Sequence, residues 1–365
     1  MIFFKNRTTY RILSFSCYLI VVSFMACNSK NDKVILHDNI LSFSTFPEET
    51  NIIFNDLIEY KEGIPGTLQL VDSTLIIFNR SKNIKSFIYN YDLKNNKFSR
   101  GYLNKGRGPG EAYGGSCTGI TKNKVWVYDV TLKKIFLIDK SIALNDECED
   151  KLFSSYPIKD HFYQIALIDS CTFWGCGMFN TPYKIQKKDF SGKELDEFGE
   201  FEYIPPKMPI DALKDAYHSF FHIKPLGDKI ALSYLYTDVL EIYDTKKPFT
   251  NIAVQGPSLV DLNFKVARIE SENYNYMEKN KDIRKTFLAG ATTDEYIYLA
   301  YSGLSYAERN DMNYCKFVFI YDWEGNPVKK LNLDRRIRGI AVSKDNKTIY
   351  SFDADTGFII KADII

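Results

Sequence analysis

The 365-residue sequence has few of the residues and motifs that mark common enzyme classes. It contains four histidines and seven cysteines, and no cysteine pair has the Cys-x-x-Cys spacing of a zinc site. Gly-x-Ser-x-Gly, His-Glu-x-x-His and calcium-loop patterns are also absent. The formal net charge is only +1 at pH 7, without a basic block. We therefore expect no cofactor, no metal ion and no nucleic-acid partner.

Cysteine is too sparse to predict a disulfide framework. Five cysteines follow the N-terminal region, which is an odd number. Cys171 and Cys176 are the only close pair, and in one strand they would stand about 16 Å apart at about 3.3 Å per residue. A bond between them would need a turn, so buried free thiols are the alternative. The five are Cys117, Cys148, Cys171, Cys176 and Cys315.

A hydrophobic run long enough to span a bilayer is absent. The apolar stretch Ile12–Met25 follows three basic residues and falls short of the roughly 18–20 residues that a transmembrane helix needs. Ala26 before Cys27 resembles a lipobox, although Phe24 stands where leucine is usual. We predict a signal peptide over residues 1–26 and a lipid on Cys27, which makes the membrane a partner. Ordinary signal cleavage and an uncleaved anchor are the alternatives.

The mature chain reads as an ordinary globular protein. Cleavage after residue 26 removes three positive charges and no negative ones, so the formal charge falls from +1 to −2. Hydrophobic residues make up 45% and charged residues 25% of the sequence. About 340 residues are more than one ordinary core fills, which favours two domains or one large modular β fold.

Short apolar strands recur along the chain, separated by polar turns. In "NKVWVYDVTLKKIFLID" two strands flank a turn, and the second strand ends in aspartate. Intervals of 47, 50, 55, 78 and 41 residues separate six such aspartates. A period near 40–50 residues with several strands in each repeat predicts an all-β, six-bladed β-propeller. The six are Asp92, Asp139, Asp189, Asp244, Asp322 and Asp363.

The predicted ring of blades needs one more strand to close it. The last repeat stops at its third strand, "TGFIIKADII", and an unclosed ring would leave an exposed strand edge. We expect residues 51–60, "NIIFNDLIEY", to supply the missing strand. The expected domains are therefore a lipidated tether over 27–50 and the propeller over 51–365.

The interval of 78 residues indicates an insertion between the fourth and fifth blades. Residues 257–285 include "ARIESENYNYMEKNKDIRK", which reads as a short polar or amphipathic helix. A long loop on a compact scaffold is often functional, and covering a strand edge is the equal alternative.

The stretch Gly106–Gly115, "GRGPGEAYGG", is rich in glycine but is not a phosphate loop. It has no Gly-Lys-Ser/Thr ending, and a strand follows it where nucleotide-binding loops require a helix. Its place between the first and second repeats predicts a corner that crosses towards the central channel. Glycine permits positive φ there, and Pro109 fixes the corner.

The "GRGPGEA" corner, the lipobox and six strand-rich repeats together resemble the TolB-like six-bladed β-propeller lipoproteins of Bacteroidota. The resemblance covers about residues 51–365, and "GRGPGEA" is its most specific element. It implies a fold and a location in the cell envelope, with the outer membrane the expected site, rather than a reaction.

Six ionisable residues are candidates for a ligand site at the channel. Arg107 and Glu111 lie on the glycine corner, while His161 and His218 lie on the expected inner strands of blades three and four. Arg268 and Arg338 are further candidates. No acid–base pair can be placed, so we predict a non-catalytic module that binds an envelope protein, a glycan or a peptide. The alternatives are a propeller hydrolase or lyase acting on an extracellular glycan or peptide, and an accessory or sensor subunit of a nutrient-uptake complex.

Overall fold

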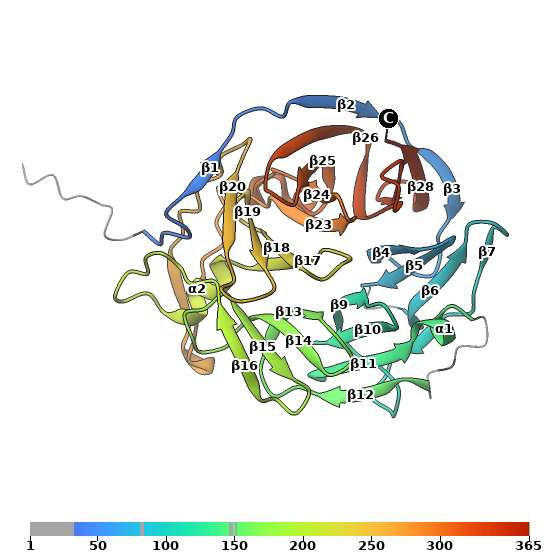
Figure 1. Cartoon of the computed structure of the whole chain (residues 1–365), viewed down its shortest axis with the longest axis horizontal. Helices are drawn as coiled ribbons and strands as arrows, with labels where there is room; N and C mark the ends of the chain where they lie inside the picture. Colours follow the sequence, from blue (N-terminus) through green and yellow to red (C-terminus); the bar gives the residue numbers. More distant parts are fainter. Residues whose placement is uncertain (1–32, 81–83, 146–148, 150–151, 365) are drawn as a thin grey trace, which may run out of the picture.

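A computed structural model describes residues 33–80, 84–145, 149 and 152–364, and most of its regular structure is β-strand (Figure 1). The strands form six blades around a central channel, which confirms the predicted propeller. Each blade is an antiparallel sheet whose first strand lines the channel and whose fourth strand lies at the perimeter.

Blades one to three follow one another directly in the sequence. Blade one contains β4 (Pro65–Val71), β5 (Thr74–Asn79), β6 (Ser86–Asp92) and an outer edge split into β7 (Lys97–Phe98) and β8 (Tyr102–Asn104). Blade two contains β9 (Gly115–Ile120), β10 (Lys124–Asp129), β11 (Lys134–Asp139) and β12 (Ser154–Pro157), with α1 (Lys140–Ala143) after β11. Blade three contains β13 (Phe162–Leu167), β14 (Thr172–Gly177), β15 (Ile185–Asp189) and β16 (Glu194–Phe198).

The second half of the ring carries the longer connections. α2 (Ile210–Ala216) leads into blade four, which contains β17 (Ser219–Ile223), β18 (Lys229–Tyr234), β19 (Val239–Asp244) and β20 (Asn251–Gln255). Blade five contains β23 (Phe287–Thr292), β24 (Tyr296–Tyr301), β25 (Cys315–Asp322) and the first part of β26 (Pro327–Val342), with a 3-10 segment at Tyr306–Asn313. Blade six contains the last part of β26, β27 (Thr348–Asp353), β28 (Phe358–Asp363) and β3 (Asn55–Glu59).

The six aspartates of the repeat end the third strands of the six blades. In blade one, Asp92 Oδ1 accepts a hydrogen bond from the Lys94 backbone N–H at 2.8 Å. In blade five, Asp322 Oδ1 accepts one from the Asn326 backbone N–H, also at 2.8 Å. These carboxylates therefore fix the turns that follow, which explains why the repeat is visible in the sequence.

The hydrophobic core lies between blades. Ala231 and Leu240 of blade four pack against Phe287 and Leu299 of blade five, and the same kind of layer recurs at each blade boundary. The alternation of apolar residues in each strand supplies both faces of a blade to these layers.

The ring is closed by the N-terminal segment, as predicted. β3 pairs antiparallel with β28, with Ile58 opposite Ile359. Arg335 contacts both Asp56 of β3 and Asp353 of blade six, which ties the closing strand to the ring.

The expected boundary between tether and propeller at residue 51 is too late. β1 (Ile40–Ser42) adds a parallel strand to β20, and β2 (Glu48–Ile52) adds one to β26. The segment thus forms a belt along the outer edges of blades four, five and six (Figure 1). The reason is burial: Phe46 is almost inaccessible and packs against Phe319 with ring centroids 4.9 Å apart.

The insertion between blades four and five is present, but its expected helix is wrong. β21 (Val266–Ile269) and β22 (Tyr274–Met277) form an antiparallel hairpin around a 3-10 turn at Glu270–Glu272. Asn273 has φ of 50°, the left-handed conformation that this turn requires. Tyrosines at 274 and 276 favour strand over helix. The hairpin is fixed to α2, because the Asp211 and Asp215 carboxylates accept hydrogen bonds from the Asn275 and Met277 backbone N–H groups.

Candidate functional site

The candidate site is the end of the central channel at which the inner strands begin, which we call the channel mouth. His161 directly precedes β13, His218 directly precedes β17, and Arg338 lies near the start of the inner part of β26. Because the inner strands of a propeller run in the same direction, these residues lie at one face of the ring. The glycine corner enters β9 at the same face.

At the glycine corner, Arg107 and Glu111 form no ion pair with each other in the part of the chain that the structure describes. Glu111 Oε2 accepts a hydrogen bond from the Gly108 backbone N–H at 2.8 Å. The Arg107 guanidinium lies 4.5 Å from the centroid of the exposed Tyr113 ring. Each side chain thus has a local partner, and the corner is wound around the Glu111 carboxylate.

Gly106 lies against the Glu111 carboxylate, which predicts the effect of a single methyl group at this position. A Cβ at position 106 would stand 1.8 Å from Glu111 Oε2. We expect Gly106→Ala to lower the free energy of unfolding by about 0.5–1.5 kcal/mol, because the Glu111 side chain must move away from the Gly108 N–H and its hydrogen bond is lost. Chemical denaturation measures it. In a Glu111→Ala background the same methyl group should cost little, and an equal cost in that background would contradict this packing.

Three cations converge at the channel mouth from blades one, six and five. Arg80 directly follows β5, Arg338 lies on β26, and Lys285 precedes β23. Gly66 lies between Arg80 and Arg338. A Cβ on Gly66 would stand 2.9 Å from Arg80 Cβ, and a Cβ on Gly339, the neighbour of Arg338, would stand 3.3 Å from the Gly66 carbonyl oxygen. Sequence patterns did not identify Arg80 and Lys285, although both occupy strand ends on the mouth side of the repeat.

These cations have no carboxylate partner among the described residues. Burial, and secondly the charge of Arg338, lowers the pKa of Arg80. Burial, followed by the charges of Arg80 and Arg338, lowers the pKa of Lys285. Lys285 Nζ donates a hydrogen bond to Asn313 Oδ1 at 2.6 Å, which supplies no counter-charge. The Arg80 side chain remains exposed to solvent in the channel, although the surrounding protein removes part of the hydration of its guanidinium group. The result is a positive region without a protein counter-ion.

The opposite side of the mouth, from blades three and four, is aromatic. The Tyr163 ring stacks on His218 with centroids 4.6 Å apart, and His161 lies 6.2 Å from Tyr163. Burial lowers the pKa of His218 to about 4. Burial, followed by the charge of Lys133, also lowers the pKa of His161. Both imidazoles are therefore neutral at pH 7, and these two side chains add no charge.

A further histidine, His222, and the candidate Arg268 lie elsewhere. His222 is buried between strands, where its Nε2 lies 2.8 Å from Ser233 Oγ, and a Cβ on Gly290 would stand 2.4 Å from its ring. Arg268 is at the tip of the insertion hairpin, where it binds Glu270 and Asn273. Of the six candidates, the structure brings His161, His218 and Arg338 to the channel mouth.

Lys214 of α2 is a buried amine near the mouth. It contacts the Tyr183 carbonyl oxygen, and its Nζ lies 4.0 Å from the Phe179 ring centroid. No carboxylate is paired with it in the described ranges. Burial therefore lowers its pKa to about 7.

This lowered pKa predicts a pH-dependent stability. Between pH 7 and about pH 10.4, which is the pKa of a lysine side chain in an unfolded protein, the unfolded chain holds one more proton than the folded chain. The free energy of unfolding should therefore rise with pH in that window, by up to about 1.4 kcal/mol per unit. Urea unfolding from pH 7 to 9.5 measures the slope. Lys214→Met should flatten it, and an unchanged slope would contradict the assignment.

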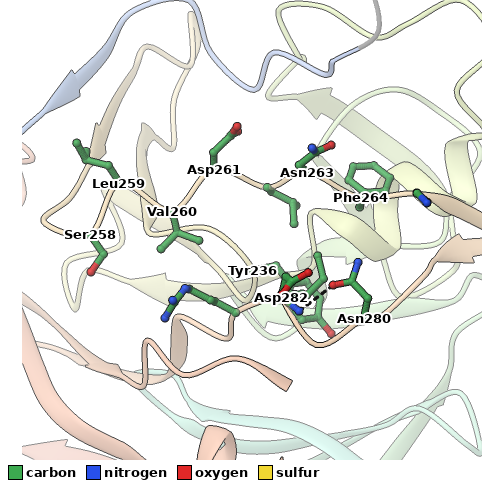
Figure 2. Close-up of a pocket in the computed structure, with 13 residues that line it drawn as sticks. Tyr236, Ser258, Leu259, Val260, Asp261, Asn263, Phe264, Asn280 and Asp282 are labelled. Carbon is green, nitrogen blue, oxygen red and sulfur yellow. Dashed lines mark hydrogen bonds between the residues drawn. The ribbon is translucent and has the colours of Figure 1, made fainter. Parts of the chain in front are cut away.

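A second hollow lies beside the mouth, and we call it the rim pocket. It has a volume of about 490 Å³. Its lining comes from residues 258–265, 280 and 282–284 of the insertion, together with Tyr236 of blade four (Figure 2). The Tyr236 hydroxyl lies 3.3 Å from that of Tyr306, whose ring is 5.6 Å from Lys285 Nζ. The rim pocket and the cationic side of the mouth are thus neighbours.

Two sequence expectations concern thiols and membrane spans. Cys117, Cys171, Cys176 and Cys315 are free, so the pair Cys171–Cys176 is not bonded. Cys148 lies outside the described residues, as do the signal peptide and Cys27. In residues 33–364, apart from the undescribed gaps, no helix has the length and apolar character needed to cross a bilayer.

Comparison with protein families agrees with the six-bladed propeller fold. The TolB-like 6-blade propeller-like family matches residues 42–345. A member of the DUF4221 family from Bacteroides vulgatus is similar in structure, with a TM-score of 0.53 and 8% identity over 86% of this chain and 96% of that one. Identity this low shows likeness of fold alone.

Two further solved structures have lower scores. The Swd1 β-propeller domain of Myceliophteria thermophila gives a TM-score of 0.47 and 12% identity, covering 86% of this chain and 100% of that one. A catalytically inactive virginiamycin B lyase from Staphylococcus aureus, solved with quinupristin, gives a TM-score of 0.46 and 12% identity, covering 86% of this chain and 99% of that one. No curated protein sequence matches significantly. The family match spans most of the sequence and agrees with the six-bladed ring: the chain belongs to the TolB-like six-bladed propeller family.

Proposed function

We propose that this protein is a lipid-anchored envelope protein and a non-catalytic binding module that takes an anionic ligand at its channel mouth. The observation that carries the proposal is the convergence of Arg80, Arg338 and Lys285 without a carboxylate partner in the described chain. Like charges in a partly desolvated channel repel one another, and an anion between them would relieve that repulsion. A planar guanidinium group can also donate two parallel hydrogen bonds to two oxygens of a carboxylate, sulfate or phosphate group.

The aromatic side of the mouth supports a ligand with a larger neutral body. Tyr163 and His218 offer ring faces and polar edges without charge. An acidic glycan or an acidic peptide has this combination of charged group and neutral body. Either can place its anionic group against the arginines and the remainder against the rings.

One observation favours an enzyme as the second candidate. His161 is exposed at the channel mouth and its pKa is lowered by burial, so its neutral imidazole can accept a proton, whereas the pKa of about 4 makes His218 a weak base. A hydrolase or lyase acting on an extracellular glycan or peptide would use such a base beside the cations. Mass spectrometry of recovered ligand distinguishes the two functions, because a binding module returns it unchanged.

The membrane anchor is a further part of the proposal. Lys33 Nζ lies 2.7 Å from Asp261 Oδ2, so the chain reaches the propeller beside the rim pocket. Six residues from Cys27 to Lys33 span at most about 22 Å, at about 3.6 Å each. A lipid on Cys27 would hold the rim pocket within that distance of the bilayer.

Cys27 therefore determines where the protein resides. We expect Cys27→Ala to remove the protein from the detergent phase and the membrane fraction, since no acyl chain can then be attached. Phase partitioning of cell lysates measures this, with Cys171→Ser, an exposed cysteine, as the matched control. Retention of the Cys27→Ala protein in the membrane fraction would contradict the anchor.

A ligand screen tests the binding function. The mature protein should be stabilised against heat by acidic glycans or acidic peptides, and less by their neutral analogues. Arg268→Gln, on the hairpin tip, should respond like the wild type. The absence of any stabilising acidic ligand, together with turnover of a glycan or peptide, would favour the enzyme.

A further inference from the structure

The rim pocket is separate from the channel cations and has its own lining. Residues 258–265 form one side, residues 280 and 282–284 form the other, and Tyr236 contributes from blade four (Figure 2). Its charged residues balance, with Asp261 and Asp282 against Lys265 and Arg284. An anion would therefore find no net attraction here, unlike at the channel mouth.

The backbone on one side of the pocket is unpaired. Residues 261–264 form no hydrogen bond through their N–H or C=O groups within the described ranges. The residues at either end are fixed: the Val260 N–H donates to Asp238 Oδ1 at 2.7 Å, and the Lys265 carbonyl accepts from the Glu278 N–H at 2.8 Å. Four consecutive residues thus hold free donors and acceptors between two anchored points.

The side chains of this segment alternate as they do in a strand. Asp261 and Asn263 are exposed, whereas Leu262 and Phe264 are half-buried. Figure 2 shows Asp261 and Asn263 pointing to one side and Val260 to the other. A period of two is the geometry of an extended strand. An extended segment with unpaired backbone groups is a template for a further strand.

We propose that residues 261–264 bind an extended peptide segment of another protein, which adds to them as a strand over the rim pocket. Backbone hydrogen bonds supply affinity in this kind of recognition, and pockets for alternate side chains supply specificity. The apolar residues Val260, Leu262 and Ile283 line the pocket, so the peptide carries apolar side chains at alternate positions. Four unpaired residues match a segment of about the same length. This site goes beyond the anionic ligand of the mouth and does not depend on it.

Peptide display on the mature protein tests the proposal. A library of random ten-residue peptides should yield binders with apolar residues at every second position. N-methylation of single peptide amides should weaken binding at least tenfold at alternate positions and little at those between, because only every second amide faces the partner strand. Peptides whose binding shows no alternation would overturn strand addition, and so would a library that yields no binder.

Variants place the site. Leu262→Ser should weaken the selected peptides at least tenfold, whereas Leu226→Ser, at a 73% exposed leucine between β17 and β18, should leave affinity unchanged. Melting temperatures show that both variants fold. Arg338→Gln should also leave peptide affinity unchanged, which separates this site from the channel mouth. Equal affinity of Leu262→Ser and wild type would overturn the proposal, as would self-association through residues 261–264 in place of peptide binding.

Discussion

Glu241→Gln should lower the free energy of unfolding by about 3–5 kcal/mol, because it leaves a buried ammonium group without its counter-charge. Lys184 Nζ lies 2.7 Å from Glu241 Oε1, and the two side chains are 3% and 0% exposed. The Tyr234 and Tyr243 hydroxyls donate to the other carboxylate oxygen. Lys184 also donates to the Leu36 carbonyl, so this one group joins blade three, blade four and the N-terminal segment.

Urea unfolding of matched variants measures this effect. Asp196→Asn breaks the pair with Lys247, whose side chain is 71% exposed, and should cost less than about 1 kcal/mol. The double variant Lys184→Met with Glu241→Leu should recover part of the loss, since it removes both buried charges. Equal costs for Glu241→Gln and Asp196→Asn would show that burial of the pair has no energetic consequence.

Arg80→Gln with Arg338→Gln should produce opposite effects on binding and on stability. Affinity for an acidic ligand should fall at least thirtyfold, because charge-assisted hydrogen bonds that are partly desolvated contribute about 2 kcal/mol or more. The unliganded protein should become more stable at low salt, because two of three mutually repelling charges are removed. Calorimetric titration and urea unfolding measure the two quantities.

Salt provides the control for the stability effect. Added sodium chloride screens the repulsion, so the difference in stability between the double variant and the wild type should shrink as ionic strength rises. Arg268→Gln removes one positive charge at the hairpin tip and should change neither affinity nor stability by more than about 0.5 kcal/mol. A double variant less stable than the wild type at low salt would mean that the arginines hold the fold together.

The sequence predicted those parts of the fold that depend on local pattern. Each third strand ends in aspartate, and at Asp92, Asp189 and Asp322 the carboxylate binds backbone N–H groups of the next turn, so the blade count followed from six residues. The closing strand followed from the missing edge of the last repeat. The belt strand β1 did not, because it has only three residues and no alternation, and its position depends on pairing with β20, more than two hundred residues away.

The candidate site was predictable only in part, because some of its residues come together only through contacts between distant parts of the chain. His161 and His218 could be placed because each belongs to the expected inner strand that opens a blade, whereas Arg338 was a candidate without a predicted position. Arg80 and Lys285 look like ordinary surface cations in the sequence, and they gain importance only where blades one, five and six meet. The insertion was misread because polar residues at 270–272 suggested a helix, while hydrogen bonds from Asn275 and Met277 to α2 favour the hairpin.

The most direct test of the mouth as an anion site is the melting temperature of the mature protein in sodium sulfate, compared with sodium chloride at equal ionic strength. Sulfate also stabilises proteins generally by exclusion from their surface, but that effect does not saturate and is common to all variants. We predict a saturable, sulfate-specific rise for the wild type and Arg268→Gln, which Arg80→Gln with Arg338→Gln abolishes. The same saturable rise in the double variant, or none in the wild type, would contradict an anion site at the channel mouth.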